Sequence, residues 1–364
     1  MKILEVIPQL STGGAERFVV DLCNELSADN EVLLVVLWPL KGDQSFFLKQ
    51  ISDKVSVESL EKHPGMDFRV FFKLRRIIRK FSPDVIHSHI DAIIYSGVFQ
   101  SFSRKGVHTV HSLARHEAGG LVQRCLRQLF FKCGRVKPVT ISKEAQKDFE
   151  SFYHIQSRLI CNGRNVPQNL VVSDDVRDEI ARYKNGKSTR VIIQLAHVDR
   201  IKRQHIMAKV AGRLVEEGFD FCVLFIGSDS RIPSYTDEVK SVMPDNCHFL
   251  GERHNPLEYL KCADALGLCS SVEGFPISII EALGVGAVPI CTPVGGIPDV
   301  ISDGGNGILS SGITEEEYYD AVKRFLQLSP DALHKMSDNA IKSYAQYSMK
   351  ECARNYLDFF KTIG

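Results

Sequence analysis

The segment 270–284 contains two carboxylates eight residues apart, and its residue types point most clearly to a ligand-binding site. Glu273 precedes Gly-Phe-Pro, and Glu281 lies further along the apolar run that follows. Proline suits the first turn of a helix, whose leading N–H groups carry the positive end of the helix dipole. Such N–H groups bind phosphate, and carboxylates bind hydroxyls. One ligand with a diphosphate between two hydroxyl-bearing ends, the shape of a nucleotide sugar, would use all three groups.

The flanking sequence places this segment at one end of a parallel sheet. Residues 265–269 and 287–291 are short apolar runs of the kind that form buried strands. The order strand, loop, helix, strand is one crossover unit of such a sheet. The spacing of the two glutamates alone is common, however, and two exposed side chains beside an ordinary amphipathic helix would also produce it.

The wider segment carries a more specific pattern. Ser270 stands three residues before Glu273, and Thr292-Pro293-Val294-Gly295-Gly296-Ile297-Pro298-Asp299 follows the second strand. As a whole, the segment resembles the donor-site signature of the retaining GT-B glycosyltransferases of glycosyltransferase family 4. The resemblance implies an α/β protein with the GT-B fold, in which two doubly wound Rossmann-like domains face a central cleft.

The resemblance also implies roles for the residues of this segment. Glu281 would bind the ribose hydroxyls, and Glu273, counted among the catalytic residues, would bind hydroxyls of the donor sugar. The backbone that would help to hold sugar and phosphate belongs to Gly274, Phe275, Pro276, Ile277 and Ser278. The family's expected route is attack on the face that the diphosphate leaves, so the acid and nucleophile roles of paired glycosidase carboxylates do not apply.

Adjacent glycines follow the first predicted strand. Gly13 and Gly14 would let backbone N–H groups approach a ligand closely, although a plain tight turn has the same sequence. The pattern is not Gly-x-Gly-x-x-Gly, which argues against a nicotinamide or flavin cofactor. The resemblance places this loop beside the donor phosphate and the acceptor, with Glu16 on the acceptor side.

Histidines end two predicted strands of the first half. His111 would point into the cleft from residues 107–111, and it matches the family histidine that contacts the donor sugar near the reacting carbon. The alternative is a histidine that merely caps a strand. His87 and His89 have a spacing that could suit a metal, but no third ligand is evident, so no metal is expected. His89 is predicted to contact the acceptor, and His87 to pack inside.

The second half supplies cations for a leaving diphosphate. Lys202 matches the family lysine, while His197 stands where family members usually carry arginine. Either Arg200 replaces that arginine, or His197 acts as a weaker, pH-sensitive partner. Gly227 matches the turn that admits the nucleotide, and Arg253 is a candidate for stacking on the base.

The length of 364 residues and the alternation of strands and helices predict two domains. The pattern breaks near residue 165. We expect an acceptor-binding Rossmann-like domain over residues 1–165, joined by a C-terminal helix at about 346–364, and a donor-binding Rossmann-like domain over 166–345. Helices are predicted at 17–26, 68–81 and 115–132, and a loop at 11–16.

Charge is divided unevenly between the halves. Residues 1–165 hold 24 Lys and Arg against 17 Asp and Glu, whereas the whole chain has a net charge of only +1. The helix expected at 69–80 sets Phe71, Phe72 and Leu74 opposite its cations. Such a helix either faces a core or lies on an anionic membrane. Nucleic acid is not expected as a partner, because no recognised motif accompanies the cations.

The remaining composition favours the cytoplasm, with peripheral attachment to the inner face of the cell membrane as an option. The sequence has no apolar stretch of 18 residues, and its first residues are expected to form a strand rather than a signal peptide. Its ten cysteines are expected to be reduced and buried.

The resemblance to glycosyltransferase family 4 implies a retaining, hexosyltransferase-type enzyme. It would move a sugar from a nucleoside diphosphate, UDP by family frequency, to a hydroxyl of a glycan or lipid-linked acceptor in cell-surface polysaccharide or glycolipid synthesis. No cofactor is expected. Two alternatives remain: a nucleotide-sugar epimerase of the same fold, and a non-catalytic subunit that binds sugar nucleotides.

Overall fold

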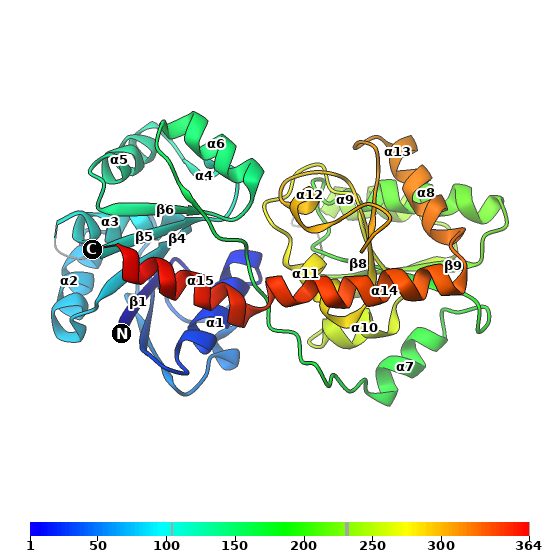
Figure 1. Cartoon of the computed structure of the whole chain (residues 1–364), viewed down its shortest axis with the longest axis horizontal. Helices are drawn as coiled ribbons and strands as arrows, with labels where there is room; N and C mark the ends of the chain where they lie inside the picture. The colour runs from blue at the N-terminus through cyan, green and yellow to red at the C-terminus, as the bar shows by residue number, and fades with distance from the viewer. Residues whose placement is uncertain (103–104, 230–232, 364) are drawn as a thin grey trace. The chain divides into compact units, whose positions relative to one another are not determined.

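The computed structural model describes residues 1–102, 105–229 and 233–363, and the chain forms two compact units (Figure 1). Unit 1 comprises Met1–Asn165 and Tyr347–Gly364, and unit 2 comprises Val166–Gln346. Each unit is built on its own parallel sheet, with helices on both faces. The prediction of an α/β protein with two doubly wound Rossmann-like domains is therefore confirmed.

Unit 1 contains a seven-stranded sheet in the order β3-β2-β1-β4-β5-β6-β7. Its strands are β1 (Lys2–Ile7), β2 (Glu31–Val36), β3 (Val55–Ser59), β4 (Val85–His89), β5 (Lys105–Val110), β6 (Val136–Thr140) and β7 (Arg158–Leu159). Its helices are α1 (Gly14–Leu26), α2 (Arg69–Phe81), α3 (Ile93–Phe102), α4 (Ala114–Glu117), α5 (Leu121–Lys132), α6 (Lys143–Tyr153) and α15 (Met349–Thr362). The reversal of strand order between β1 and β4 is the point where ligands bind in open α/β sheets.

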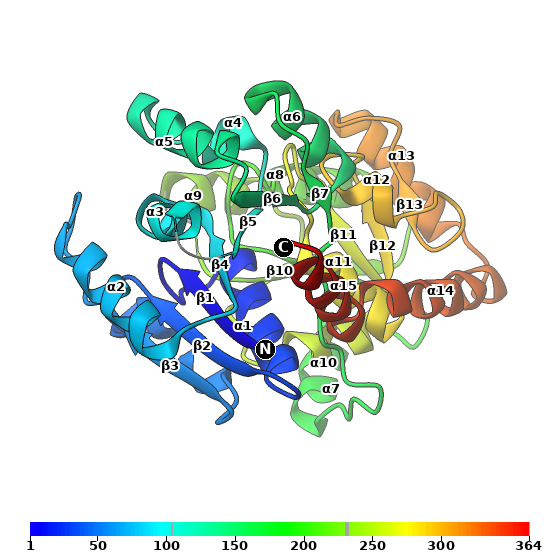
Figure 2. The ribbon, with the colours of Figure 1, turned by 60° about the vertical axis from the view of Figure 1, so that its left-hand side comes forward.

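Alternating residues of β1 serve the two faces of this sheet. Leu4 and Val6 belong to a core that includes residues of α2, α3, α5 and α6. On the opposite face α1 packs against α15, and Tyr356 of α15 lies beside His87 of β4. Figure 2 shows the two groups of helices on opposite sides of the strands. The returning C-terminal helix thus covers the face to which Glu5 points.

Unit 2 contains a six-stranded sheet in the order β10-β9-β8-β11-β12-β13. Its strands are β8 (Arg190–Leu195), β9 (Phe221–Ile226), β10 (Cys247–Gly251), β11 (Ala265–Leu268), β12 (Val288–Cys291) and β13 (Ile308–Leu309). Its helices are α7 (Asp174–Ala181), α8 (Gln204–Glu216), α9 (Pro233–Ser241), α10 (Pro256–Cys262), α11 (Ile277–Val285), α12 (Ile297–Val300), α13 (Glu315–Leu326) and α14 (Pro330–Tyr344). The central strands β8 and β11 are neighbours, and their carboxyl ends carry most of the predicted donor-site residues.

Several predicted elements differ from the structure. The helix expected over 115–132 is two helices, α4 and α5, because Gly119 has a φ of +70° and breaks the helical path. The loop expected over 11–16 ends earlier than predicted, since α1 begins at Gly14. The apolar helix α3 was missed, because consecutive residues such as Ile93, Ile94 and Tyr95 are all buried and leave no amphipathic period.

Two predictions concern the state of the cysteines and the presence of membrane-spanning helices. All ten cysteines are free thiols, although Cys125 and Cys133 are exposed where burial was expected. In the part of the chain that the structure describes, every helix is too short or too polar to cross a membrane.

Candidate active site

An ion pair joins the carboxyl ends of β8 and β11 in unit 2. Lys202 Nζ lies 2.6 and 2.8 Å from the two carboxylate oxygens of Glu273. Ser270 Oγ donates a further hydrogen bond of 2.6 Å to the same carboxylate. Glu273 is buried, so its charge depends on these partners. Lys202 and Glu273, two of the residues predicted to bind the donor, are thus brought into direct contact.

The loop that carries Glu273 is held by the segment that follows β12. Thr292 Oγ1 donates to the carbonyl oxygen of Ser270 at 2.6 Å, and the Gly296 N–H donates to the carbonyl oxygen of Gly274 at 2.7 Å. Gly295 has a φ of +61°, and a Cβ at this position would lie 2.2 Å from the carbonyl oxygen of Glu273. Only glycine allows this approach, which gives the Gly-Gly of the family pattern a physical reason.

Helix α11 begins beside this ion pair, at Ile277 rather than at Pro276, which is its N-cap residue. No side chain caps this end of the helix. The Ile279 N–H donates to the carbonyl oxygen of Pro276 at 3.2 Å, so the N–H groups of Ile277 and Ser278 are the candidates for a phosphate contact. Glu281 lies in the second turn and is buried. Ion pair, helix start and second glutamate occur in the order expected from the sequence.

Two neighbouring turns complete this edge of the unit 2 sheet. Gly227 has a φ of +155°, and a Cβ there would lie 2.1 Å from the carbonyl oxygen of Ala196. His197, which follows β8, is exposed, and its Nδ1 is hydrogen-bonded to Oγ of Ser228, which follows β9. The chain segments after β8 and β9 therefore lie in close contact at Gly227.

The two predicted arginines already have protein partners. Arg200 Nη2 lies 2.7 Å from Glu238 Oε2, and its guanidinium lies 5.0 Å from the centre of the Tyr235 ring. Arg253 lies 2.7 Å from a Glu179 oxygen and donates to Tyr259 Oη at 3.0 Å. Hydrogen bonds to Glu179 raise the pKa of Arg253. In the structure both guanidinium groups are engaged with helices, whereas Lys202 contacts Glu273.

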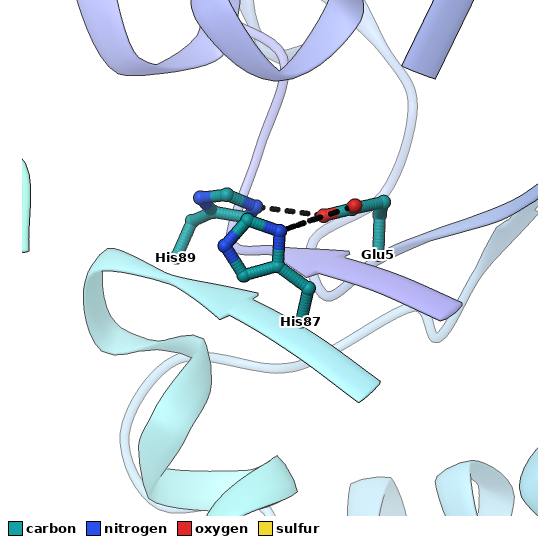
Figure 3. Close-up of side chains that lie close together, drawn as sticks. All are labelled: Glu5, His87 and His89. Carbon is teal, nitrogen blue, oxygen red and sulfur yellow. Dashed lines mark hydrogen bonds and ion pairs between the residues drawn. The ribbon is translucent and has the colours of Figure 1, made fainter. Parts of the chain in front are cut away.

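A second buried group lies in unit 1, and sequence reasoning missed its central member. Glu5 is paired in register with His87, so Glu5, His87 and His89 point to one face (Figure 3). His87 Nδ1 lies 3.1 Å from Glu5 Oε1, and His89 Nε2 lies 2.8 Å from Glu5 Oε2. The expectation that no third group accompanies the two histidines is wrong. The available signal was an acidic residue inside an otherwise apolar strand.

These three side chains are also the one group of described residues whose atoms lie close enough together, within 4.8 Å, to hold a metal ion. The direct hydrogen bonds between them satisfy the same atoms. His87 Nε2 lies 2.8 Å from Thr109 Oγ1, which lies 2.8 Å from Tyr356 Oη. In the structure, hydrogen bonds thus engage the carboxylate and imidazole atoms that could bind a metal.

His111 extends this network toward a pocket of about 380 Å³. Its Nε2 lies 3.0 Å from His89 Nδ1, and its backbone N–H donates to Glu117 Oε2 at 2.8 Å. The pocket is lined by Ala15, Ile90, Asp91, His111, Ser112, His116, Glu117, Gly119 and Gln123. Burial lowers the pKa of His111 well below its usual range and raises that of Glu117. His111 Nδ1 has no hydrogen-bond partner among the described residues, which costs about 1–3 kcal/mol.

The remaining unit 1 candidates lie deeper than expected. His89, which is predicted to contact the acceptor, has no exposed surface, and its Nδ1 lies against His111 Nε2. His87 is buried, as predicted. Glu16 is also buried and accepts a hydrogen bond from Ser11 Oγ at 3.1 Å. Gly13 gives it room, since a Cβ there would lie 2.1 Å from Glu16 Oε2, while Gly14 has open space around its Cα.

Comparison with known proteins places the chain in a family. The model of Glycosyltransferase Family 4 matches residues 12–193, which is half of the chain, and the model of Glycosyl transferases group 1 matches residues 175–343. A similar protein of Campylobacter jejuni is named GalNAc-alpha-(1->4)-GalNAc-alpha-(1->3)-diNAcBac-PP-undecaprenol alpha-1,4-N-acetyl-D-galactosaminyltransferase. It is 23% identical, and the alignment covers 100% of this chain and 99% of the relative.

Solved structures agree on the fold. A glycosyltransferase from Rickettsia africae superposes with a TM-score of 0.85 at 20% identity, covering 100% of this chain and 98% of that one. HepE of Anabaena, solved in complex with UDP-glucose, gives a TM-score of 0.81 at 16% identity and covers 100% of both chains. With the two parallel sheets and the ion pair at the start of α11, these matches show that the chain has the GT-B fold and belongs to glycosyltransferase family 4.

Proposed function

We propose that the protein is a retaining glycosyltransferase that moves a sugar from a nucleoside diphosphate, most simply UDP, to an acceptor hydroxyl. The observation that carries this proposal is the Lys202–Glu273 ion pair beside the uncapped start of α11. Within one group of loops, Lys202 supplies a cation, Glu273 supplies a carboxylate that can accept hydrogen bonds from hydroxyls, and α11 supplies a helix N-terminus. A nucleotide sugar is the ligand class that uses all three.

Each group of this cluster has a proposed role in donor binding. Glu281 binds the ribose, the leading N–H groups of α11 bind phosphate, and Glu273 accepts hydroxyls of the sugar. Lys202 neutralises the charge that builds on the leaving diphosphate, with His197 or Arg200 as the second cation. Because Lys202 and Glu273 already pair with each other, the donor must replace this pair with separate contacts to each side chain.

The proposed retaining route comes from the family resemblance, and the contacts of the two glutamates agree with it. Glu273 is ion-paired with Lys202, and Glu281 is buried in the second turn of α11, so we assign neither of them the role of nucleophile. We therefore propose attack on the face that the diphosphate leaves, with a phosphate oxygen taking the proton of the acceptor hydroxyl. Differential stabilisation of the leaving diphosphate is then the main catalytic contribution.

Unit 1 is proposed to bind the acceptor, which we infer to be a glycan or a lipid-linked glycan in cell-surface polysaccharide or glycolipid synthesis. The name of the Campylobacter jejuni relative, which includes a diphosphate-linked undecaprenol, supports this class. We propose that the pocket lined by His111 binds the acceptor sugar that carries the attacking hydroxyl.

We also propose that α2 attaches the protein to an anionic membrane from the cytoplasmic side. Phe68 and Phe72 are 70% and 73% exposed, and Met66 is 51% exposed. Phe72 was expected on the core side of the helix, but it lies among the exposed cations Lys73, Arg75, Arg76, Arg79 and Lys80. Exposed aromatic side chains within a basic cluster suit the boundary between headgroups and acyl chains.

A product assay tests the proposed reaction directly. The purified protein is incubated with a panel of nucleotide sugars, with and without membrane extracts as a source of acceptor. Acceptor-dependent release of nucleoside diphosphate, with the anomeric configuration of the donor kept in the product by NMR, is expected. Conversion of the donor to another nucleotide sugar without acceptor would show an epimerase instead. Donor binding with neither outcome would show a non-catalytic subunit.

A further inference from the structure

The histidine chain of unit 1 begins at a carboxylate that can only accept hydrogen bonds. Burial alone would raise the pKa of Glu5, but the charge and hydrogen bonds of His87 and His89 lower it to about 2. An ionised carboxylate has no proton to donate. The hydrogen bond of 2.8 Å between His89 Nε2 and Glu5 Oε2 therefore requires the proton to be on His89 Nε2.

The second link follows from the neutrality of His89. Burial and the charge of His87 lower the pKa of His89 to about 4, although Glu5 acts in the opposite direction. Near neutral pH this ring carries one proton, on Nε2, so its Nδ1 can only accept. His111 Nε2 lies 3.0 Å from that nitrogen and must be the donor.

The last link reaches the pocket. His111 is neutral as well, because burial lowers its pKa, and with its proton on Nε2 its Nδ1 has a free lone pair. We propose that Glu5 and His89 are positioning residues that hold His111 in the tautomer protonated on Nε2, so that Nδ1 accepts a hydrogen bond from a carbohydrate hydroxyl. The nature of the ligand rests on the proposed function, whereas the tautomer rests on the hydrogen-bond chain and on the ionised Glu5 carboxylate at its start.

The surroundings of His111 fix its orientation from other sides. Glu117 Oε2 accepts from its backbone N–H, and the Phe18 ring meets the imidazole edge-on with centroids 5.5 Å apart. Glu5 lies on β1, His89 on β4 and His111 directly after β5. The adjacent strands β1 and β4 thus contribute two members, and the third directly follows their neighbour β5. Side chains carried by a sheet hold such a geometry better than side chains on long loops.

Nitrogen-15 NMR of the protein labelled in histidine tests the tautomer without any substrate. Near neutral pH, the long-range proton–nitrogen spectrum should show the proton of both His89 and His111 on Nε2 and bare Nδ1 nitrogens. Signals are assigned by their loss in His89→Asn and His111→Asn. His116 lines the same pocket but does not belong to the hydrogen-bond chain of Glu5, His89 and His111, so it serves as an internal reference. A His111 proton on Nδ1, or a mixture of tautomers, would overturn the proposal.

Kinetics test whether Glu5 acts through His111. In Glu5→Gln an NH₂ group replaces one of the two carboxylate oxygens. The side chain can then no longer accept hydrogen bonds from both His87 and His89 in the present geometry. We expect kcat/KM for release of nucleoside diphosphate to fall about tenfold, the scale of one hydrogen bond. The double variant Glu5→Gln/His111→Asn should be no slower than His111→Asn alone. Losses that multiply would show that Glu5 only supports the fold, and thermal unfolding identifies any misfolded variant.

The outcomes separate this inference from the proposed function. A wild-type protein that never consumes a nucleotide sugar would refute the function, while the NMR result still decides the tautomer. Elemental analysis of the purified protein provides a further check. A stoichiometric metal ion held by Glu5, His87 and His89 would displace the protons of the chain and overturn the proposal.

Discussion

At the scale of single residues, the donor site depends on charges that neutralise one another. Glu273 is buried, and its partners are Lys202 and Ser270. Removal of one member of such a pair leaves the other charge buried without compensation. Sequence reasoning found all three residues through a family pattern, but it could not predict the ion pair, which depends on β8 and β11 being neighbours in the sheet.

The variant Lys202→Ala should lower turnover by at least roughly a hundredfold, because a preorganised charge beside the leaving diphosphate is lost. Steady-state release of nucleoside diphosphate measures this effect. Lys209→Ala is the matched control, since it removes a lysine of α8 whose partner is Glu315 on the surface. Turnover of Lys202→Ala close to that of Lys209→Ala would contradict the assignment.

Gly295 permits a second test at this scale. Gly295→Ala should lower the free energy of unfolding by roughly 1–3 kcal/mol and weaken donor binding, because its Cβ meets the Glu273 carbonyl oxygen at a φ of +61°. Gly304→Ala is the control, since it has a similar φ of +72° but nothing within 4 Å of the added Cβ. Equal effects of the two substitutions on donor binding would show that the Gly295 contact has no role in the site.

At the scale of elements, the sequence predicted the strands of both sheets better than the helices between them. Strands β11 and β12 lie within one residue of the predicted bounds 265–269 and 287–291, because apolar runs between turns define them clearly. Helix α3 has no polar face, and α10 and α14 carry no motif, so none of them was predicted. For α2 the helix was predicted correctly, but its period did not reveal that Phe72 lies on the exposed side.

The exposed face of α2 predicts membrane binding. Sedimentation with vesicles rich in anionic lipid should capture the protein, and capture should fall with added salt, since the cations are screened. Phe68→Ser/Phe72→Ser should reduce capture several-fold. Ile341→Ser, which removes an exposed apolar side chain of α14, should not. Capture that does not depend on salt or on the two phenylalanines would leave α2 as an ordinary surface helix.

At the scale of the whole molecule, the two units differ in their buried titratable groups. Unit 1 buries His89 and His108 and partly buries His111, and loss of solvation lowers the pKa of each. The same unit contains Glu5 and the unpartnered Nδ1 of His111. None of these contacts could be predicted from the sequence, because residues 5, 89 and 111 meet only through the strand order of the sheet.

Unit 1 should therefore lose stability in mild acid. Below about pH 6.5 these histidines bind protons in the unfolded chain first, so the free energy of unfolding falls as the pH drops from 6.5 toward 4. For His89, whose pKa falls from 6.5 to about 4, the loss is on the order of 3 kcal/mol. Burial raises the pKa of Glu117, so this one carboxyl group binds its proton more readily in the folded chain and partly offsets the loss of stability.

Trp38 is the only tryptophan of the chain and packs against the unit 1 core, so its fluorescence reports this unit. The urea midpoint measured by Trp38 should be lower near pH 5 than near pH 7. A midpoint that is constant or rises on acidification would show that these histidines are not held neutral.

The central claim is that unit 2 binds a nucleoside diphosphate between Lys202 and Glu281, and calorimetry tests it most directly. UDP, GDP, ADP and TDP are titrated into the wild type, into Glu281→Ala and into the control Glu216→Ala, which removes an exposed carboxylate of α8. We predict that one of them binds the wild type and the control equally, and that Glu281→Ala weakens binding at least tenfold, because a charge-assisted hydrogen bond to the ribose is lost. Absence of binding by all four nucleotides, or equal binding by Glu281→Ala, would contradict the claim.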